Sequence, residues 1–131
     1  MKTLVVGVDG GGTKTRAVLA NENGKPIAEA VGAGSAIRPE DIERSAGVIA
    51  GVVRDVIEQS GEKDVPRVLC VGVAGAGRDS EKQALWESLG QHNLADEVVV
   101  EPDFAVALDD AFGDGVGVLL ISGTGSSAFG R

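Results

Sequence analysis

The chain opens with three apolar segments whose pattern predicts strands rather than helices. Residues 4–8 form a continuous apolar run, and residues 15–20 are β-branched and apolar. The pair Asn23-Gly24 is a hairpin turn signal, and a strand pattern resumes over residues 27–31. Three consecutive strands joined by short turns are therefore expected before the first helix.

Residues 39–59 show helical spacing instead. Apolar residues recur there at intervals of three and four, which places them on one stripe of a helix; they are Ile42, Ala46, Ile49, Val53, Val56 and Ile57. Pro39 suits the first turn of this helix, and Gly61 follows its end. We interpret the stripe as core packing and not as a functional surface.

The next part of the chain alternates strands with helices. Residues 68–73 and 97–101 are apolar runs of the kind found in strands buried on both faces of a parallel sheet. Ser80, with Gln83 three residues later, predicts the capping box of a helix between these two strands. A third helix is expected over residues 103–112.

Composition narrows the class of protein. The 131 residues are enough for one proper core, and the formal net charge of −8 argues against nucleic acid or an anionic membrane as partner. Cys70 is the single cysteine, so no disulfide framework is possible and a reducing compartment is expected. No apolar run approaches membrane-spanning length, and the N-terminus does not resemble a signal peptide. These features predict a cytoplasmic protein.

The most informative stretch follows the first strand. It consists of Asp9, Gly10, Gly11, Gly12, Thr13 and Lys14. Glycines allow backbone N–H groups to approach a phosphate closely, and a carboxylate at the strand end can hold a hydrated divalent cation beside it. A glycine-rich hairpin without a ligand is the alternative, although two glycines would suffice for a turn.

This stretch is not a Walker loop. Gly7 and Gly12 have the required separation, but Thr13 stands where that motif needs lysine. A Walker loop also opens a helix, whereas residues 15–20 predict a strand. We therefore expect a tight turn between antiparallel strands, with phosphate above the turn.

A second turn of similar composition lies near the end of the chain. Residues 116–121 predict an apolar strand, and hydroxyl and glycine residues follow it, among them Gly123, Thr124, Gly125 and Ser126. Between the two turns, Asp103 directly follows the strand at residues 97–101 and Pro102. An aspartate there can act as a helix N-cap, and it also reaches the crevice where open α/β sheets bind ligands.

These motifs resemble the actin, sugar-kinase and heat-shock-chaperone ATPase superfamily. The sequence DGGGTKT at residues 9–15 is most similar to the first phosphate motif of N-acetylglucosamine kinases. The sequence ISGTGS at residues 121–126 resembles their second phosphate motif. The resemblance covers the whole chain. It implies that ATP phosphates lie between the two turns, with Mg²⁺ positioned through water by Asp9.

The resemblance also implies roles in sugar binding and proton transfer. Asp103 would accept the proton of the attacking sugar hydroxyl. The loop at residues 32–39 would touch the sugar, and Ser35 and Ala36 stand there where the family usually carries asparagine. Gly75, Ala76 and Gly77 would lie near the sugar as well. A plain connection to the next helix remains the alternative for the first loop, and spacing alone favours a simple strand-to-helix turn for the second.

The order of elements predicts an α/β protein with a ribonuclease-H-like lobe, whose mixed five-stranded sheet is flanked by helices. This lobe would span residues 1–113. Residues 114–131 would supply the first strand and glycine turn of an incomplete second lobe. Because an unpaired apolar strand is a template for another chain, residues 115–131 are expected to pair with the same segment of a second copy in a homodimer. Folding of this segment back onto the sheet of its own chain is the alternative.

The function inferred is that of the N-terminal half of an ATP-dependent sugar kinase, acting on an N-acetylglucosamine-like or glucosamine-like sugar and nearly inactive alone. A non-catalytic lobe for phosphate binding or assembly is one alternative. Another is an ATPase that activates a 2-hydroxyacyl-CoA dehydratase, which would need more cysteines than Cys70 for its iron–sulfur cluster.

Overall fold

The computed structural model describes residues 3–21, 25–102, 104, 106 and 107. Within these ranges it contains the strands β1 (Val5–Gly10), β2 (Lys14–Ala20), β3 (Pro26–Ala33), β4 (Val68–Val73) and β5 (Glu97–Glu101), and the helices α1 (Ile42–Ser60) and α2 (Asp79–Gly90). The five strands expected within residues 1–113 are all present. The bounds of β4 and β5 are those that the apolar runs predicted.

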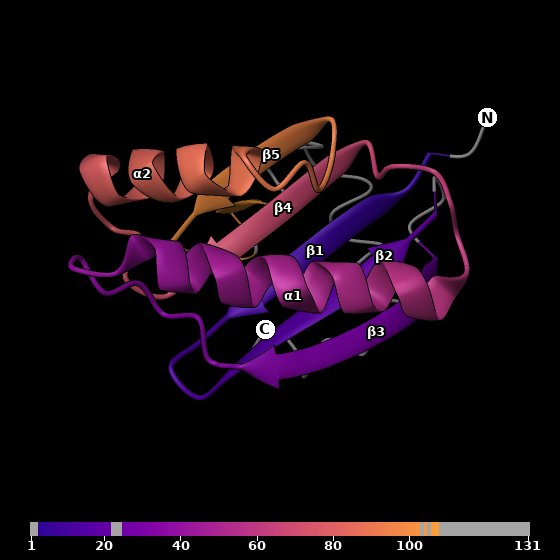
Figure 1. Cartoon of the computed structure of the whole chain (residues 1–131), viewed down its shortest axis with the longest axis horizontal. Coiled ribbons are helices and arrows are strands. Elements are labelled where there is room, and N and C mark those ends of the chain that lie inside the picture. Colours follow the sequence, from indigo (N-terminus) through magenta and orange to yellow (C-terminus); the bar gives the residue numbers. More distant parts are fainter. Residues whose placement is uncertain (1–2, 22–24, 103, 105, 108–131) are drawn as a thin grey trace.

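The strands form one mixed sheet in the order β3-β2-β1-β4-β5. The pairs β1–β2 and β2–β3 are antiparallel, whereas β1–β4 and β4–β5 are parallel. The α/β class and the mixed five-stranded sheet are therefore confirmed. Since β1, β4 and β5 run in the same direction, their carboxyl ends share one edge of the sheet, where the glycine turn also lies (Figure 1).

Side chains alternate between two apolar cores, one on each face of the sheet. Val6 and Val8 of β1 face the core built with α1 and α2, and both helices lie on this face in Figure 1. Val5 faces the opposite core, which includes Phe104 and Ala107. A period of two is what a strand requires, and burial on both faces accounts for the continuous apolar run.

Both helices begin at other residues than the pattern indicated. Helix α1 starts at Ile42 rather than at Pro39, because Asp41 caps it: its carboxylate accepts from the Arg44 amide at 3.3 Å. Gly61 ends this helix in the left-handed conformation, with φ of 75°, as expected.

The capping box at Ser80 is wrong. The Lys82 amide donates to the Arg78 carbonyl at 3.0 Å, which starts α2 at Asp79 and places Ser80 inside the first turn. Arg78 occupies the N-cap position without a side-chain hydrogen bond to the helix. Neither helix in the described ranges is long and apolar enough to cross a lipid bilayer.

Several predictions fall outside the described residues. They concern Asp103, the strand at residues 116–121 and the second glycine turn with Gly123, Thr124, Gly125 and Ser126. The division at residue 113 and the pairing of residues 115–131 in a homodimer belong to the same part of the chain. All of these stay predictions.

Candidate functional site

The turn between β1 and β2 is the tight antiparallel connection that the sequence predicted. Gly10 pairs with Thr15 in the β1–β2 register, and the Gly11 amide donates to the Lys14 carbonyl at 2.9 Å. The strand resumes at Lys14, and no helix begins at Thr13. The prediction of a hairpin is confirmed, and a Walker loop is excluded.

Beside this turn lies a small hollow of about 170 Å³. It is lined by Asp9, Gly11, Thr13, Lys14 and Arg16. Asp9 and Arg16 are partners in the antiparallel register, and Arg16 also forms an ion pair with Glu29 of β3 at 2.6 Å. One carboxylate, two cationic side chains and a glycine backbone suit a phosphate group with a hydrated cation at its side.

Two further loops meet the glycine turn at the same edge of the sheet. The amides of Ser35 and Ala36 both donate to the Gly11 carbonyl, at 3.0 and 3.2 Å. The Ala74 amide donates to the Gly10 carbonyl at 2.9 Å. The three segments that the resemblance assigned to phosphate and sugar are therefore joined by backbone hydrogen bonds.

The loop after β4 is held against the loop after β3. The Ile37 amide donates to the Ala74 carbonyl at 2.8 Å, and Gly75 adopts φ of +94°, a conformation that favours glycine. A Cβ at Gly75 would lie only 3.0 Å from the Ile37 carbonyl oxygen. Gly75 and Gly77 are exposed, whereas Ala76 is buried, so the glycines are the accessible part of this loop.

Ser35 lies below the surface of its loop. Its side chain is wholly buried, and its hydroxyl accepts a 2.7 Å hydrogen bond from the Thr15 hydroxyl, which is also buried. Direct contact between this hydroxyl and a sugar would require the loop to open. Sequence reasoning missed Thr15; its one signal was the period of two, which places Thr15 on the same face of β2 as the apolar Ala17 and Leu19.

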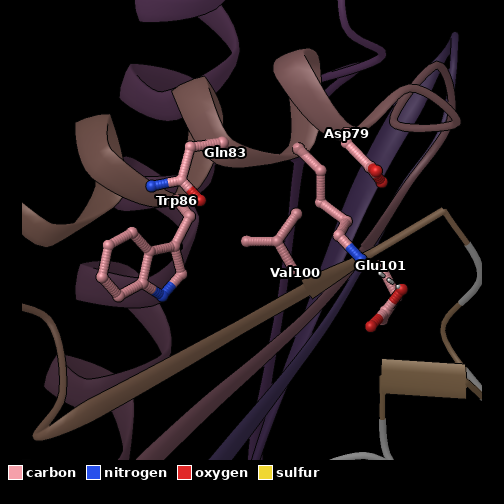
Figure 2. A pocket seen from close by; sticks show the side chains of 6 residues that line it. Asp79, Gln83, Trp86, Val100 and Glu101 are labelled. Carbon is pink, nitrogen blue, oxygen red and sulfur yellow. Dashed lines mark hydrogen bonds and ion pairs between the residues drawn. The ribbon is translucent and has the colours of Figure 1, made fainter.

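A larger groove, of about 440 Å³, lies between α2 and the end of β5 (Figure 2). It is lined by Asp79, Lys82, Gln83, Trp86, Val100 and Glu101. The Lys82 ammonium pairs with the Glu101 carboxylate at 3.1 Å, and the Trp86 indole N–H donates to the Val98 carbonyl at 2.8 Å. These bonds fix both side chains, although Trp86 remains 47% exposed.

Cys70 lies in the middle of β4 and is fully buried. Burial, with a smaller contribution from the charge of Glu97, raises the pKa of its thiol to about 12. The thiolate is the form that binds metals, and the structure disfavours it here. Cys70 is therefore a core residue.

We expect native Cys70 to resist a thiol-specific reagent at pH 8. A pKa near 12 instead of 9.0 lowers the thiolate fraction about a thousandfold. The folded state favours the neutral thiol, whereas the unfolded chain ionises it above pH 9. The free energy of unfolding therefore does not depend on this thiol below pH 9 and falls as the pH rises from 9 toward 12. Stopped-flow labelling with and without guanidinium tests the first expectation, and fast labelling of the native chain would contradict it.

The sheet order, the strand-end aspartate and the antiparallel glycine turn define an actin-like ATPase lobe of the type found in sugar kinases. Residues 6–131 match the BadF/BadG/BcrA/BcrD ATPase family, and the chain belongs to this family. The resemblance inferred from the motif at residues 9–15 is confirmed.

Curated relatives and solved structures agree with this placement. The chain is 27% identical, over 97% of its length, to the N-acetylmuramic acid/N-acetylglucosamine kinase of Clostridium acetobutylicum. It is 32% identical, over 98% of its length, to the N-acetyl-D-glucosamine kinase of Dictyostelium discoideum. A ROK family glucokinase from Streptomyces griseus, solved with glucose and AMPPNP, superposes on 86% of the chain with a TM-score of 0.60 and 26% identity.

The chain is much shorter than these proteins. It spans 42% of the Clostridium kinase, 44% of the Dictyostelium kinase and 38% of the Streptomyces glucokinase. The match therefore concerns less than half of each relative.

Proposed function

We propose that this chain forms the N-terminal lobe of an ATP-dependent kinase for an amino sugar such as N-acetylglucosamine or glucosamine. The observation that carries the proposal is the turn at Gly10–Gly12, which follows Asp9 at the end of β1 and joins antiparallel strands. The named activities of the Clostridium and Dictyostelium relatives support the choice of sugar.

In this proposal the turn binds the phosphates of ATP. The backbone amides of the turn, the Thr13 hydroxyl and the Lys14 ammonium supply donors and positive charge near developing negative charge. A Cβ at Gly12 would meet no atom within 4 Å, so the space beside Gly12 is open to a ligand. The second turn, at Gly123–Ser126, would hold the phosphates from the other side.

Asp9 would hold Mg²⁺ through water. The described residues contain no group of three potential metal ligands, so a cation near Asp9 would take its other ligands from water and phosphate. This arrangement is the one Mg²⁺ commonly uses with nucleotides, and the ion would neutralise phosphate charge. Asp103 would accept the proton of the sugar hydroxyl.

The sugar would contact the two loops beside the turn. Gly75 and Gly77 offer exposed backbone, whereas the buried Ser35 and Ala76 would act through the position of their loops. Backbone hydrogen bonds join these loops to Gly10 and Gly11, which supports the proposal of one connected site for sugar and phosphate.

We expect the isolated 131-residue chain to bind ATP weakly and to turn over far below the ~1–100 s⁻¹ of ordinary kinases. Phosphoryl transfer needs positioning from two sides and exclusion of water, and one lobe supplies neither. Calorimetry of ATP with and without Mg²⁺, together with sugar-dependent ADP release, measures both properties.

The outcomes separate the candidate functions. ATP binding without turnover agrees with a kinase lobe, and absence of ATP binding would favour a lobe used only for folding or assembly. Turnover at an ordinary rate would contradict the idea of an incomplete site, and would indicate that two copies assemble one. Iron bound to the purified chain would favour the dehydratase activator, which the burial of Cys70 disfavours.

A further inference from the structure

We propose that Gly34 and the buried pair Thr15–Ser35 position the phosphate-binding amides of the β1–β2 turn. The inference rests on the proposed function, because it assigns the phosphates to that turn. It gives the loop after β3 a different role from the one its resemblance implied, namely to aim the backbone of the neighbouring turn.

The first step concerns the Gly11 carbonyl, which accepts from the amides of both Ser35 and Ala36, at 3.0 and 3.2 Å. This carbonyl therefore faces the loop. In a trans peptide the carbonyl of one residue and the N–H of the next point in opposite directions. No cis peptide occurs among the described residues, so the Gly12 N–H points away from the loop.

The second step concerns the next peptide. A Cβ at Gly34 would collide with the carbonyl oxygen of Gly12, so the loop backbone packs directly against this carbonyl as well. The same trans geometry then directs the Thr13 N–H away from the loop. Within the described part of the chain, no hydrogen bond uses the amide of Gly12 or of Thr13. Two consecutive N–H groups on one side form a concavity that suits an anion.

The third step is what holds the loop in place. The Thr15 hydroxyl donates to the Ser35 hydroxyl at 2.7 Å, and both side chains are wholly buried. A Cβ at Gly10 would collide with the Ser35 hydroxyl oxygen, so the absence of a side chain at Gly10 makes room for this pair. Leaving a buried hydroxyl without a hydrogen-bond partner costs free energy, so this hydrogen bond holds the turn and the loop in one relative position.

Helix α1 also holds the loop through hydrogen bonds. The Ser45 hydroxyl donates to the Ala36 carbonyl at 3.2 Å, and the Arg44 guanidinium donates to the Gly34 carbonyl at 3.4 Å. Ser45 is buried, so this contact belongs to the packed part of the fold. The loop therefore behaves as a rigid support for the carbonyls of Gly11 and Gly12.

The test uses the 131-residue chain and inorganic tripolyphosphate as probe. Calorimetry gives the affinity, and ¹⁵N-edited NMR follows the amides of Gly12 and Thr13 before and during titration. Thr15→Val removes the hydroxyl and keeps the side-chain shape, whereas Thr15→Ser keeps the hydroxyl. Gly34→Ala introduces the Cβ that would meet Gly12, and Gly47→Ala is its control, because a Cβ at Gly47 meets no atom within 4 Å.

We expect Thr15→Val and Gly34→Ala to shift the two amides in the free chain and to weaken tripolyphosphate binding about tenfold, the effect of a lost or misaimed hydrogen bond. Thr15→Ser and Gly47→Ala should bind like the parent. Should Gly34→Ala fail to fold, the two Thr15 variants decide. If Thr15→Val binds as tightly as the parent, the positioning role is overturned while the phosphate site stands. If the parent chain itself shows no binding and no amide shift, the phosphate role of the turn is overturned, and the positioning role with it.

Discussion

Replacing Asp103 by asparagine is expected to lower the turnover of a sugar kinase that contains this lobe by ~10²–10⁴-fold, the usual contribution of a general base. Asparagine has nearly the same shape but cannot accept the proton of a sugar hydroxyl. ATP affinity should be unchanged, because the proposed phosphate contacts come from the glycine turns. The expectation rests on the place of Asp103 in the chain, two residues beyond the end of β5 at Glu101.

Asp103 lies outside the described residues, but its neighbours in the chain, Pro102 and Phe104, are described. Strand β5 is parallel to β4 and ends at the edge of the sheet where β1 carries Asp9. Phe104, the next residue, is buried in the core on the face opposite α1. The end of β5, two residues before Asp103, therefore lies at the edge that carries the glycine turn.

Asp96→Asn is a matched control for Asp103→Asn. Asp96 immediately precedes β5, so the same substitution falls at the opposite end of the same strand, on an exposed side chain. Steady-state kinetics with varied ATP and varied sugar would separate turnover from affinity. If the turnover of the Asp103→Asn variant stays within threefold of the parent, Asp103 serves only as a helix cap.

The parts of the fold that could be predicted from sequence are those fixed by local pattern. The run at residues 68–73 indicated both ends of β4, because a strand covered on both faces needs an apolar residue at every position. The glycine turn after Asp9 was predicted with its strand direction, since β-branched residues followed it without helical spacing. Both signals lie within a few residues of the structure that they specify.

Helix starts were predicted less well because several residues compete to begin a helix. Pro39, Asp41 and Ser80 all suit a first turn or an N-cap. Which residue takes that position depends on how the preceding loop reaches the sheet. In α1 that loop is tied to Gly11 and Ala74, and the helix begins only after Asp41.

The contacts around the candidate site could not be predicted from local sequence patterns. The hydrogen bond between Thr15 and Ser35 joins residues twenty positions apart, on a strand and a loop that meet only after the sheet forms. Gly34 carries no local signal of its role, because only the fold places it against the Gly12 carbonyl. The Thr15 hydroxyl has no hydrogen-bond partner close to it in the sequence. Its pairing with Ser35 therefore could not be assigned before the fold was known.

Val6→Ala is expected to lower the free energy of unfolding by about 2–3 kcal/mol, the range for emptying a fully buried valine site. Val6 lies on β1, the middle strand of the sheet, and is completely inaccessible within the core beneath α1. Removing two methyl groups there leaves space that neighbouring strands cannot easily fill. For a domain with the usual ~5–15 kcal/mol of stability, this loss is a large fraction.

Val65→Ala makes the same chemical change at a site where it should cost within about 0.5 kcal/mol, because Val65 precedes β4 and is 58% exposed. Urea unfolding followed by far-UV circular dichroism measures both variants, and equal slopes against urea would show that the same surface is exposed on unfolding. The difference between the two variants isolates burial from composition, because each replaces one valine by alanine in an extended or irregular segment. A Val6→Ala loss as small as that of Val65→Ala would contradict the packing of β1 beneath α1, on which the position of Asp9 and the glycine turn depends.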